Sequence, residues 1–269
     1  MENIAKKRLV AVSMFAVIAA IAVGATLAYF TDTDQATNTF TVGNVAIDLI
    51  EQQRGANGLE DFENEKILMP IVGSAQGDKD AYGMPVAANY VDKMVTVKNT
   101  GASGAWVRAY FAIPSALDNG YDSFNAGLNV LHFNFGSHAD GSTTYGTEWL
   151  WKHGAAWNYY ETVIGNVNYN VYFADYYQAL AAGATTVRFV NGVYLDKTFE
   201  KKADGYYAFG EKLTLPASML GADGNIKTIT CPVMAVAVQA DGFADAATAV
   251  TEAFGDKYNP FGGAATNWQ

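Results

Sequence analysis

Apolar and polar residues alternate over short stretches through much of this chain, which is the pattern of β-strands with one buried face. The clearest stretch is 167–173, where aromatic and β-branched residues occupy every second position. Residues 159–164 precede it, and Gly165-Asn166 lies between the two stretches. A short turn dipeptide between two alternating stretches predicts a β-hairpin.

Two further pairs of stretches predict hairpins by the same reasoning. Residues 94–98 alternate in polarity, residues 105–113 are rich in aromatic residues, and a loop that contains Gly101, Ser103 and Gly104 joins the two stretches. Residues 187–190 and 193–195 flank Asn191-Gly192, a dipeptide that favours the backbone conformations of hairpin turns. We therefore expect a hairpin with a long loop in the first case and a tight hairpin in the second.

The last third of the chain predicts a buried strand and one helix. Residues 228–238 are rich in valine, and Pro232 indicates a bulge or a position near the start of that strand. Asp241-Gly242 opens the predicted helix and Gly255 ends it. Its apolar residues at helical spacing are Phe243, Ala246, Val250 and Phe254. By contrast, residues 51–90 show little periodicity and are expected to be loop or irregular edge.

Many short strands with regular turns and few helices are typical of a two-sheet β-sandwich. Seven Asn-Gly or Asp-Gly pairs mark turns, and 31 Tyr and Phe residues against 6 prolines favour strands. Half of the residues are hydrophobic, which excludes disorder as the main state. No internal repeat or linker interrupts residues 45–269, so we expect one all-β antiparallel domain there.

Charge and cysteine content limit the classes of function. The chain has 17 basic and 27 acidic residues, a formal net charge of −10. An acidic surface repels phosphate backbones, so no nucleic-acid partner is expected. The single cysteine, Cys231, excludes an intrachain disulfide framework. Three histidines leave little material for a histidine-rich metal site.

Residues 1–28 are typical of an export signal. Lys6, Lys7 and Arg8 precede an apolar run that ends in small residues at Ala28. The run is about 20 residues long, so a permanent membrane anchor is the alternative. In both cases the rest of the chain lies outside the cytosol, with the basic cluster inside. We expect the signal to be cleaved and the protein to be secreted or associated with the cell surface.

Residues 29–44 form a separate extended piece. Phe40 and Val42 share one strand face, while Val45, Ile47 and Leu49 share a face in the opposite phase. Gly43-Asn44 lies at the change of phase, and a change of register needs a bulge or a bend. The sequence therefore predicts a hinge at Gly43 and Asn44, with the second piece built into the sheet of the domain.

These motifs resemble the TasA/camelysin family of exported proteins. The resemblance rests on the segments 6–8, 24–34 and 39–45, and continues in patches through 95–101, 106–109, 204–207 and 240–243. It implies a signal cut between Ala28 and Tyr29 by a SipW-type signal peptidase. It also implies a jelly-roll-like sandwich that assembles into fibres of the biofilm matrix.

In such fibres the N-terminal strand of one subunit completes the sheet of the next, which is strand addition to an open sheet edge. The resemblance thus makes residues 29–42 the candidate donor strand, with Tyr29, Phe30, Phe40 and Val42 as its apolar and aromatic residues. The expected partners are further copies of the chain, and other matrix proteins or polysaccharide.

The sequence contains no pattern of a catalytic site. His-Glu-x-x-His, Gly-x-Ser-x-Gly, a phosphate loop and a dinucleotide fingerprint are all absent. We expect His132 on the less buried face of its strand and Cys231 as a buried apolar residue. The chain is therefore expected not to be an enzyme, with no catalytic, cofactor-binding or metal-binding residues.

Two other classes of function stay open. The aromatic cluster 157–160 would suit an adhesin that binds sugar, although packing in a core explains it equally well. A camelysin-type metallopeptidase would need two histidines and a carboxylate around one zinc ion. Asp32-x-Asp34 and the acids at 78 and 80 would suit calcium, but solvated loop acids are the expected state because EF-hand spacing is missing.

Overall fold

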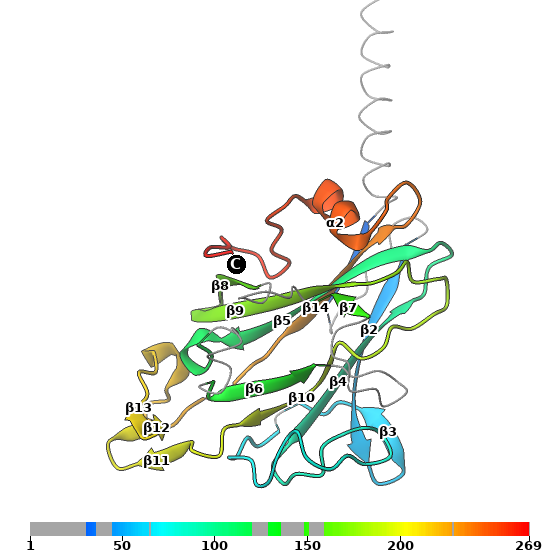
Figure 1. Ribbon diagram of the computed structural model, residues 1–269. Coiled ribbons are helices and arrows are strands. Elements are labelled where there is room, and N and C mark those ends of the chain that lie inside the picture. Colours follow the sequence, from blue (N-terminus) through cyan, green and yellow to red (C-terminus); the bar gives the residue numbers. More distant parts are fainter. Residues whose placement is uncertain are drawn as a thin grey trace, which may run out of the picture.

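The computed structural model describes residues 31–35, 45–64, 66–119, 129–135, 148–150, 159–227 and 229–268. Two large antiparallel sheets face each other, and a small three-stranded sheet projects from one end (Figure 1). The predicted all-β sandwich is therefore confirmed. The predicted export signal, residues 1–28, lies outside the described residues.

One sheet has six strands in the order β1-β14-β5-β9-β7, with β8 paired to β9. Its strands are β1 (Thr31–Gln35), β5 (Ala105–Pro114), β7 (Trp149–Leu150), β8 (Tyr159–Ile164), β9 (Val167–Tyr176) and β14 (Val233–Gln239). The other sheet has five strands in the order β3-β2-β4-β10-β6. Its strands are β2 (Ile47–Gly55), β3 (Gly58–Asp61), β4 (Val91–Asn99), β6 (Leu131–Phe135) and β10 (Val190–Leu195).

The remaining elements are short. The small sheet consists of β11 (Glu200–Lys202), β12 (Gly205–Ala208) and β13 (Glu211–Lys212). Single 3-10 turns occur at η1 (Ser115–Leu117) and η3 (Ala217–Met219), and α2 (Ala246–Phe254) is the α-helix predicted near the end of the chain.

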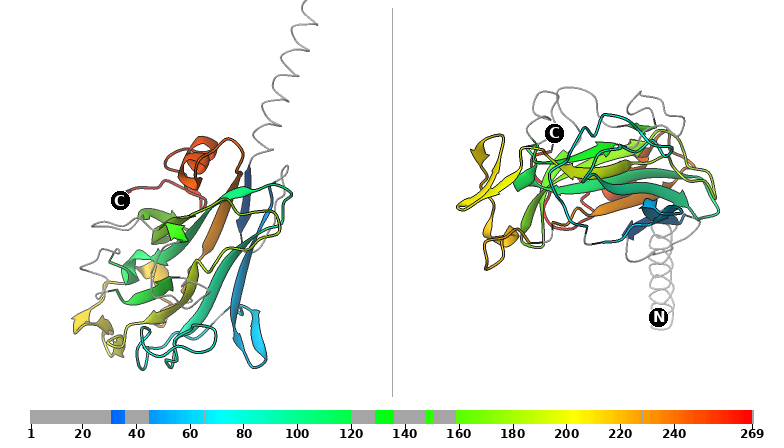
Figure 2. Two further views of the ribbon diagram at one scale, coloured as in Figure 1. Left: turned by 45° about the vertical axis from the view of Figure 1, so that its right-hand side comes forward. Right: turned by 90° about the horizontal axis from the view of Figure 1, so that it is seen from below.

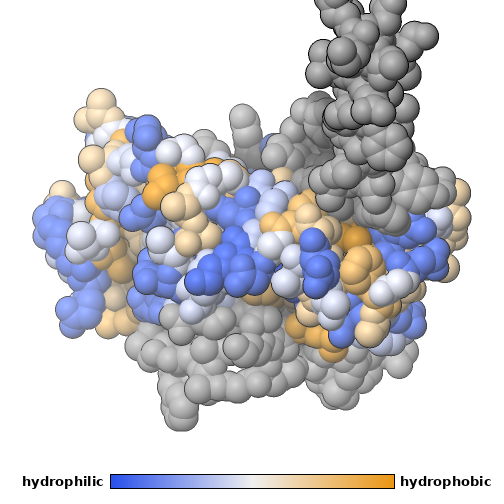
Figure 3. All heavy atoms as spheres, turned by 90° about the horizontal axis from the view of Figure 1, so that it is seen from above, coloured by the Kyte–Doolittle hydropathy of each residue, from blue (hydrophilic) through white to orange (hydrophobic). Residues whose placement is uncertain are grey.

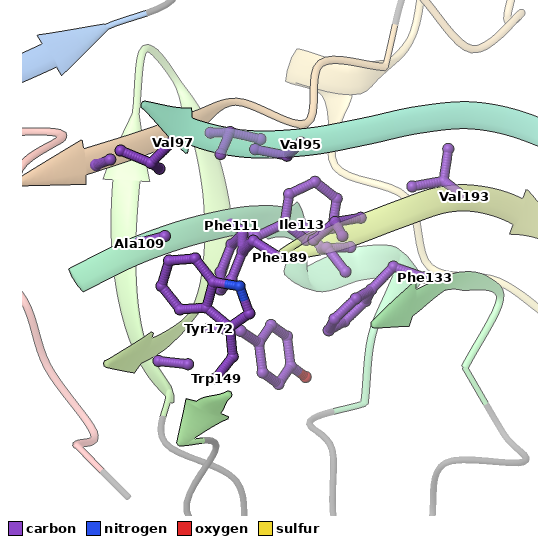
Figure 4. Close-up of a cluster of buried hydrophobic side chains, with 14 of the residues drawn as sticks. Val95, Val97, Ala109, Phe111, Ile113, Phe133, Trp149, Tyr172, Phe189 and Val193 are labelled. Carbon is purple, nitrogen blue, oxygen red and sulfur yellow. The ribbon is translucent and has the colours of Figure 1, made fainter. Parts of the chain in front are cut away.

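The core lies between the two large sheets, where alternate residues of each strand point inward (Figure 4). Val95 and Val97 of β4 meet Phe111 and Ile113 of β5, and all four are fully buried. Burial of a side chain of this size stabilises the fold by roughly 1.5–3 kcal/mol. Trp149 completes the layer, and its Nε1 donates to the carbonyl of residue 187 at 3.0 Å.

Both outer faces of the sandwich are partly covered. α2 and residues 255–268 lie on the outer face of the six-stranded sheet, where they pack against Val236 and Val238 (Figure 1). On the five-stranded sheet, Met84 from the irregular segment 66–90 is buried against Met94. Hydrophilic residues occupy much of the described surface at the end that is seen from above (Figure 3).

The β8–β9 hairpin is confirmed, with Gly165 at φ 61° in its turn. The alternation predicted in β9 separates two buried faces. Tyr169 and Val171 pack in the cluster beneath α2, whereas Tyr172 points into the core between the sheets. Both faces are buried because the five-stranded sheet covers one of them and α2 with residues 255–268 covers the other.

The hairpin predicted for 94–98 and 105–113 is wrong. β4 pairs with β2 and β10, whereas β5 pairs with β14 and β9, so the two strands lie in different sheets. The connection between them crosses the sandwich. Asn99 holds this crossing, because its Nδ2 donates to the carbonyls of Ser103 and Leu180, both at 2.8 Å.

The hairpin predicted at Asn191-Gly192 is also wrong. β10 is one strand that pairs with β4 and β6, and its register shifts between Val190 and Gly192. A Cβ added at Gly192 would lie 2.4 Å from the carbonyl oxygen of Val91. This glycine therefore permits a close approach of two strands at a bulge instead of making a turn.

The helix is confirmed with a later start than predicted. Its N-cap is Asp245, whose carboxylate accepts a bond from the Thr248 amide at 2.7 Å, in place of Asp241-Gly242. Gly255 ends the helix with φ 96°, a conformation that favours glycine.

Two predicted boundaries between irregular and regular structure also differ from the observed ones. Residues 51–61 are not irregular, because they contain the end of β2, a turn at Ala56-Asn57 and β3. The strand predicted over 228–238 begins only at Val233, directly after Pro232. The position of the proline near the strand start is confirmed.

Candidate assembly site

β1 and β14 form one edge of the six-stranded sheet, and the predicted donor segment supplies β1. The strands are antiparallel, with Thr31 opposite Val238 and Gln35 opposite Met234. Figure 2 (left) shows β1 and β2 side by side along this edge, in two shades of blue. The sequence of β1, Thr-Asp-Thr-Asp-Gln, contains no apolar residue. The ladder with β14 attaches β1 to the sheet through main-chain pairing.

Along β14 and the residues before it, successive residues point their main-chain N–H and C=O groups alternately toward β5 and toward the sheet edge. Ala112 N donates to the Pro232 carbonyl at 3.0 Å, so position 232 is bonded to β5. Odd-numbered residues then direct their N–H and C=O groups away from β5. The N–H that Pro232 lacks falls on the β5 side. Val233 and Cys231 consequently present complete main-chain groups toward the sheet edge.

Beyond Met234, toward the small sheet, this edge opens into a groove of about 1300 Å³ between the two large sheets. The start of β14 and the residues before it form one wall, and β2 with the residues after β3 forms the other. Among the described strands, none runs between β2 and the start of β14. The apolar residues of the floor are Leu49, Leu68, Val91, Val193, Leu195, Phe199 and Ile229.

The rim of the groove is charged but balanced. Lys93 Nζ lies 2.7 Å from Glu51 Oε1, and the two side chains are 10% and 15% exposed. Lys93 also lies over the ring of Phe62, 4.6 Å from its centroid. Farther out, Lys66 pairs with Glu63 at 3.0 Å. Asp61 and Lys227, which are of opposite sign, also line the groove. Because the groove carries charges of both signs, it suits an uncharged occupant better than an ion.

Cys231 lines the groove. Burial raises the pKa of its thiol to about 12, although the residue as a whole is half-buried. A thiol with this pKa is protonated at neutral pH and is a weak nucleophile. Cys231 therefore acts as a small apolar residue of the groove wall.

Most of the residues predicted for processing and assembly lie outside the described residues: Ala28, Tyr29, Phe30, Phe40, Val42, Gly43 and Asn44. The described part of the donor segment is β1. Directly after the predicted hinge, Val45 and Ile47 are fully buried and Leu49 packs against the core. The second extended piece is thus part of the domain's own sheet, as predicted.

Of the three histidines, only His132 lies in the described part of the chain. Its ring stacks on Tyr194 with centroids 4.8 Å apart, and its Nε2 lies 3.6 Å from Asp196 Oδ2. Burial lowers the pKa of His132 from its usual 6.5, and Asp196 opposes that shift. The described residues contain no group of three His, Cys, Asp or Glu arranged to hold a metal ion.

The described half of the aromatic cluster is packed inside the protein. Tyr160 is fully buried, with its ring 4.2 Å from Trp268 and its hydroxyl donating to Asn259 at 2.8 Å. Tyr159 packs against the core between the sheets. Among the acids considered for calcium, Asp80 instead accepts a bond from Arg54 at 2.8 Å.

The groove is the feature that the sequence did not reveal, because its walls come from opposite ends of the chain. One local signal was available in β4. Lys93 shares the inward face of β4 with Val91 and Val95, where a charged residue is unexpected. A lysine on an otherwise apolar strand face indicates that the core is open to solvent at that point.

No protein-family model, curated protein or solved structure matches this chain. Within the described ranges, no helix combines the length and the apolar character needed to cross a membrane.

Proposed function

We propose that this chain is an exported structural subunit of TasA-like extracellular fibres. The N-terminal strand of one copy would be added to the sheet edge of the next. The observation that carries the proposal is β1, an N-terminal strand without apolar residues that lies at a sheet edge. The resemblance of residues 24–45 to the TasA/camelysin family points in the same direction.

The physical basis is that a strand edge binds any chain that offers matching main-chain groups. A β1 strand from a second copy would make the same ladder with β14 that the chain's own β1 makes. Donor and acceptor are different surfaces, so the contact is heterologous, and it builds an open filament when the rotation between copies does not close a ring.

The other edge of the six-stranded sheet is less accessible. Thr266 and Glu161 of β8 exchange two backbone bonds, both 2.8 Å long. Thr162 Oγ1 donates to the carbonyl of Ala264 at 3.0 Å. Residues 259–268 therefore cover β8 through main-chain and side-chain bonds, which directs strand addition to the β14 edge.

The proposal includes export and processing. Cleavage between Ala28 and Tyr29 by a SipW-type signal peptidase would free the donor strand, because an N-terminus held in a membrane does not readily enter another subunit. A jelly-roll-like sandwich outside the cell would then form biofilm matrix fibres beside other matrix proteins or polysaccharide.

The test is electron microscopy of the chain from Tyr29 onward beside a chain that starts at Val45. A matched pair of proline variants sharpens it. Asp34 lies opposite Ala235, which directs its main-chain groups toward β1, whereas Thr33 lies opposite Val236. Asp34→Pro therefore removes a ladder N–H, and Thr33→Pro places the missing N–H on the far side.

We expect filaments from the longer chain and from Thr33→Pro, and none from the Val45 chain or from Asp34→Pro. Filaments from the Val45 chain would show that the N-terminal strand is not the assembly element. If every form stays monomeric over a range of pH and salt, the fibre proposal fails. A binding module or adhesin would then be the leading interpretation, and a ligand search would follow.

A further inference from the structure

Building on the proposed fibre function, we propose that the groove beside residues 229–233 holds residues 36–42 of a second copy. These residues would continue the register of β1, so that Phe40 lies opposite Ile229. The inference concerns the place and register of the contact, and it can fail while strand addition itself stands.

The register follows from the ladder between β1 and β14. Each step forward along β1 is one step back along β14, from Thr31 opposite Val238 to Gln35 opposite Met234. Continued past Gln35, the same ladder places position 36 opposite Val233, where the groove begins. It then places Asn38 opposite Cys231 and Phe40 opposite Ile229.

The chain's own N-terminal segment cannot make this pairing. Asn99 Nδ2 and Ala105 N both donate to the Leu180 carbonyl, at 2.8 and 3.0 Å, which places them at the same end of the sandwich. Ile47 lies opposite Asn99, and Gln239 lies opposite Ala105. The chain therefore enters β2 at the Gln239 end, far from the groove.

A distance estimate makes the constraint quantitative. A strand paired as far as Phe40 would end opposite Ile229, roughly 33 Å along the sheet from Gln239 at about 3.3 Å per residue. The seven residue steps from Phe40 to Ile47 span at most about 25 Å. Only a donor from another copy can therefore run along the whole edge.

The composition of residues 36–42 matches the groove. The sequence Ala-Thr-Asn-Thr-Phe-Thr-Val carries no charge, and the groove is lined by charges of both signs, including the ion pairs Lys93–Glu51 and Lys66–Glu63. Residues directly opposite each other in an antiparallel pair share a face. Phe40 would share the face of Ile229, which packs against the core between the sheets. The three threonines at odd positions suit the outer face of a strand.

A donor strand from a second copy would consequently form a longer ladder along this edge than the chain's own β1 forms. β1 of the same chain covers the edge from Met234 to Val238. A donor from a second copy would cover that stretch and also the groove, where its apolar residues gain burial. We infer that the intrachain β1 is a temporary cover, displaced after residues 36–42 of another copy enter the groove.

The single native cysteine allows the register to be measured. Directly opposite, hydrogen-bonded residues of antiparallel strands have Cα atoms about 5.5 Å apart, within the roughly 4.4–6.8 Å range of disulfides. Asn38→Cys in the chain from Tyr29 onward should therefore form a disulfide with Cys231 of the next copy upon mild oxidation of filaments. Thr37→Cys and Thr39→Cys, on the opposite strand face, are the matched controls.

We expect a ladder of covalent oligomers on non-reducing gels for Asn38→Cys, and little cross-linking for the two controls. Asn38→Cys combined with Cys231→Ser should give no ladder. Filaments in which a different position cross-links best, or in which no position reaches Cys231, would overturn the register or the groove while leaving strand addition intact. Absence of filaments from the unmodified chain would instead reject the fibre function.

A second measurement tests the anchor residue. Phe40→Ala should raise the protein concentration needed for filament formation by roughly tenfold or more, because a buried aromatic side chain is lost. Thr39→Ala is the control and should change it much less. Equal effects of the two substitutions would contradict the placement of Phe40 in the groove.

Discussion

Replacing Gly192 by alanine tests how closely β10 and β4 approach at the floor of the groove. The added Cβ would lie 2.4 Å from the Val91 carbonyl oxygen and 2.6 Å from Cε1 of Tyr90. Real Cβ atoms do not approach other atoms this closely, so either the backbone of β4 or the ring of Tyr90 must move. Moving β4 disturbs its ladder with β10, and moving Tyr90 uncovers a residue that is 9% exposed.

Overpacking of a core costs typically 1–3 kcal/mol, and we expect about 3 kcal/mol here because one of the neighbours is backbone. The dependence of the unfolding free energy on urea is at most about 3 kcal/mol per molar urea. The urea concentration at the midpoint of unfolding should therefore fall by about 1 M or more. The assay is equilibrium urea unfolding of the chain from Val45 onward, followed by tryptophan fluorescence.

Gly104→Ala is the matched control, since its Cβ would lie 3.6 Å from that of Ala240, an ordinary contact. It should change the free energy of unfolding by no more than about 0.5 kcal/mol. If Gly192→Ala were as stable as this control, the interpretation of position 192 as a close approach between strands would be wrong.

Three further predictions concern single residues. Burial lowers the pKa of His132 below its unfolded value of 6.5, so its contribution to stability should be complete above pH 6.5 and decline as the pH falls below it. His132→Phe, which keeps a ring against Tyr194, should lose less stability than the wild type between pH 7.5 and 5.5 in urea unfolding. Asp245→Ala should destabilise α2 by about 1 kcal/mol through loss of the N-cap, with Asp256→Ala as an unaffected control in the same melt. Asp175→Ala leaves Arg108, whose Nε lies 2.6 Å from the lost carboxylate, buried without its partner. A loss of about 3–5 kcal/mol is expected, and a loss as small as that of Glu63→Ala, on an exposed pair, would contradict this.

Local sequence patterns predicted the strands better than their partners. The strand-like composition of β4 and β5 is the same whether two strands form a hairpin or cross between sheets, so it did not distinguish the two arrangements. Asn191-Gly192 has the composition of a turn, but its role depends on Val91, a hundred residues earlier. The β8–β9 hairpin was predictable because its turn and both of its strands are local.

The candidate site was predictable only in part. The strand β1 and the buried face of Val45 and Ile47 are local properties of the sequence. The hinge predicted at Gly43 and Asn44 lies outside the described residues. The groove is not a local property, because Leu49 and Ile229 contribute to it from opposite ends of the chain. Only the three-dimensional arrangement of the two sheets brings these residues together.

The pairing of β1 with β14 also has a consequence for the order of folding. Thr31 and Val238 are more than 200 residues apart in sequence, so this contact closes one of the longest loops in the molecule. Pairings that close long loops form late, because the entropy of closure is lost before the contact is gained. A newly synthesised chain would therefore pass through an interval with an open β14 edge and an unpaired N-terminal strand. During that interval the local concentration of other copies, rather than the stability of the finished monomer, would decide which strand reaches the edge first.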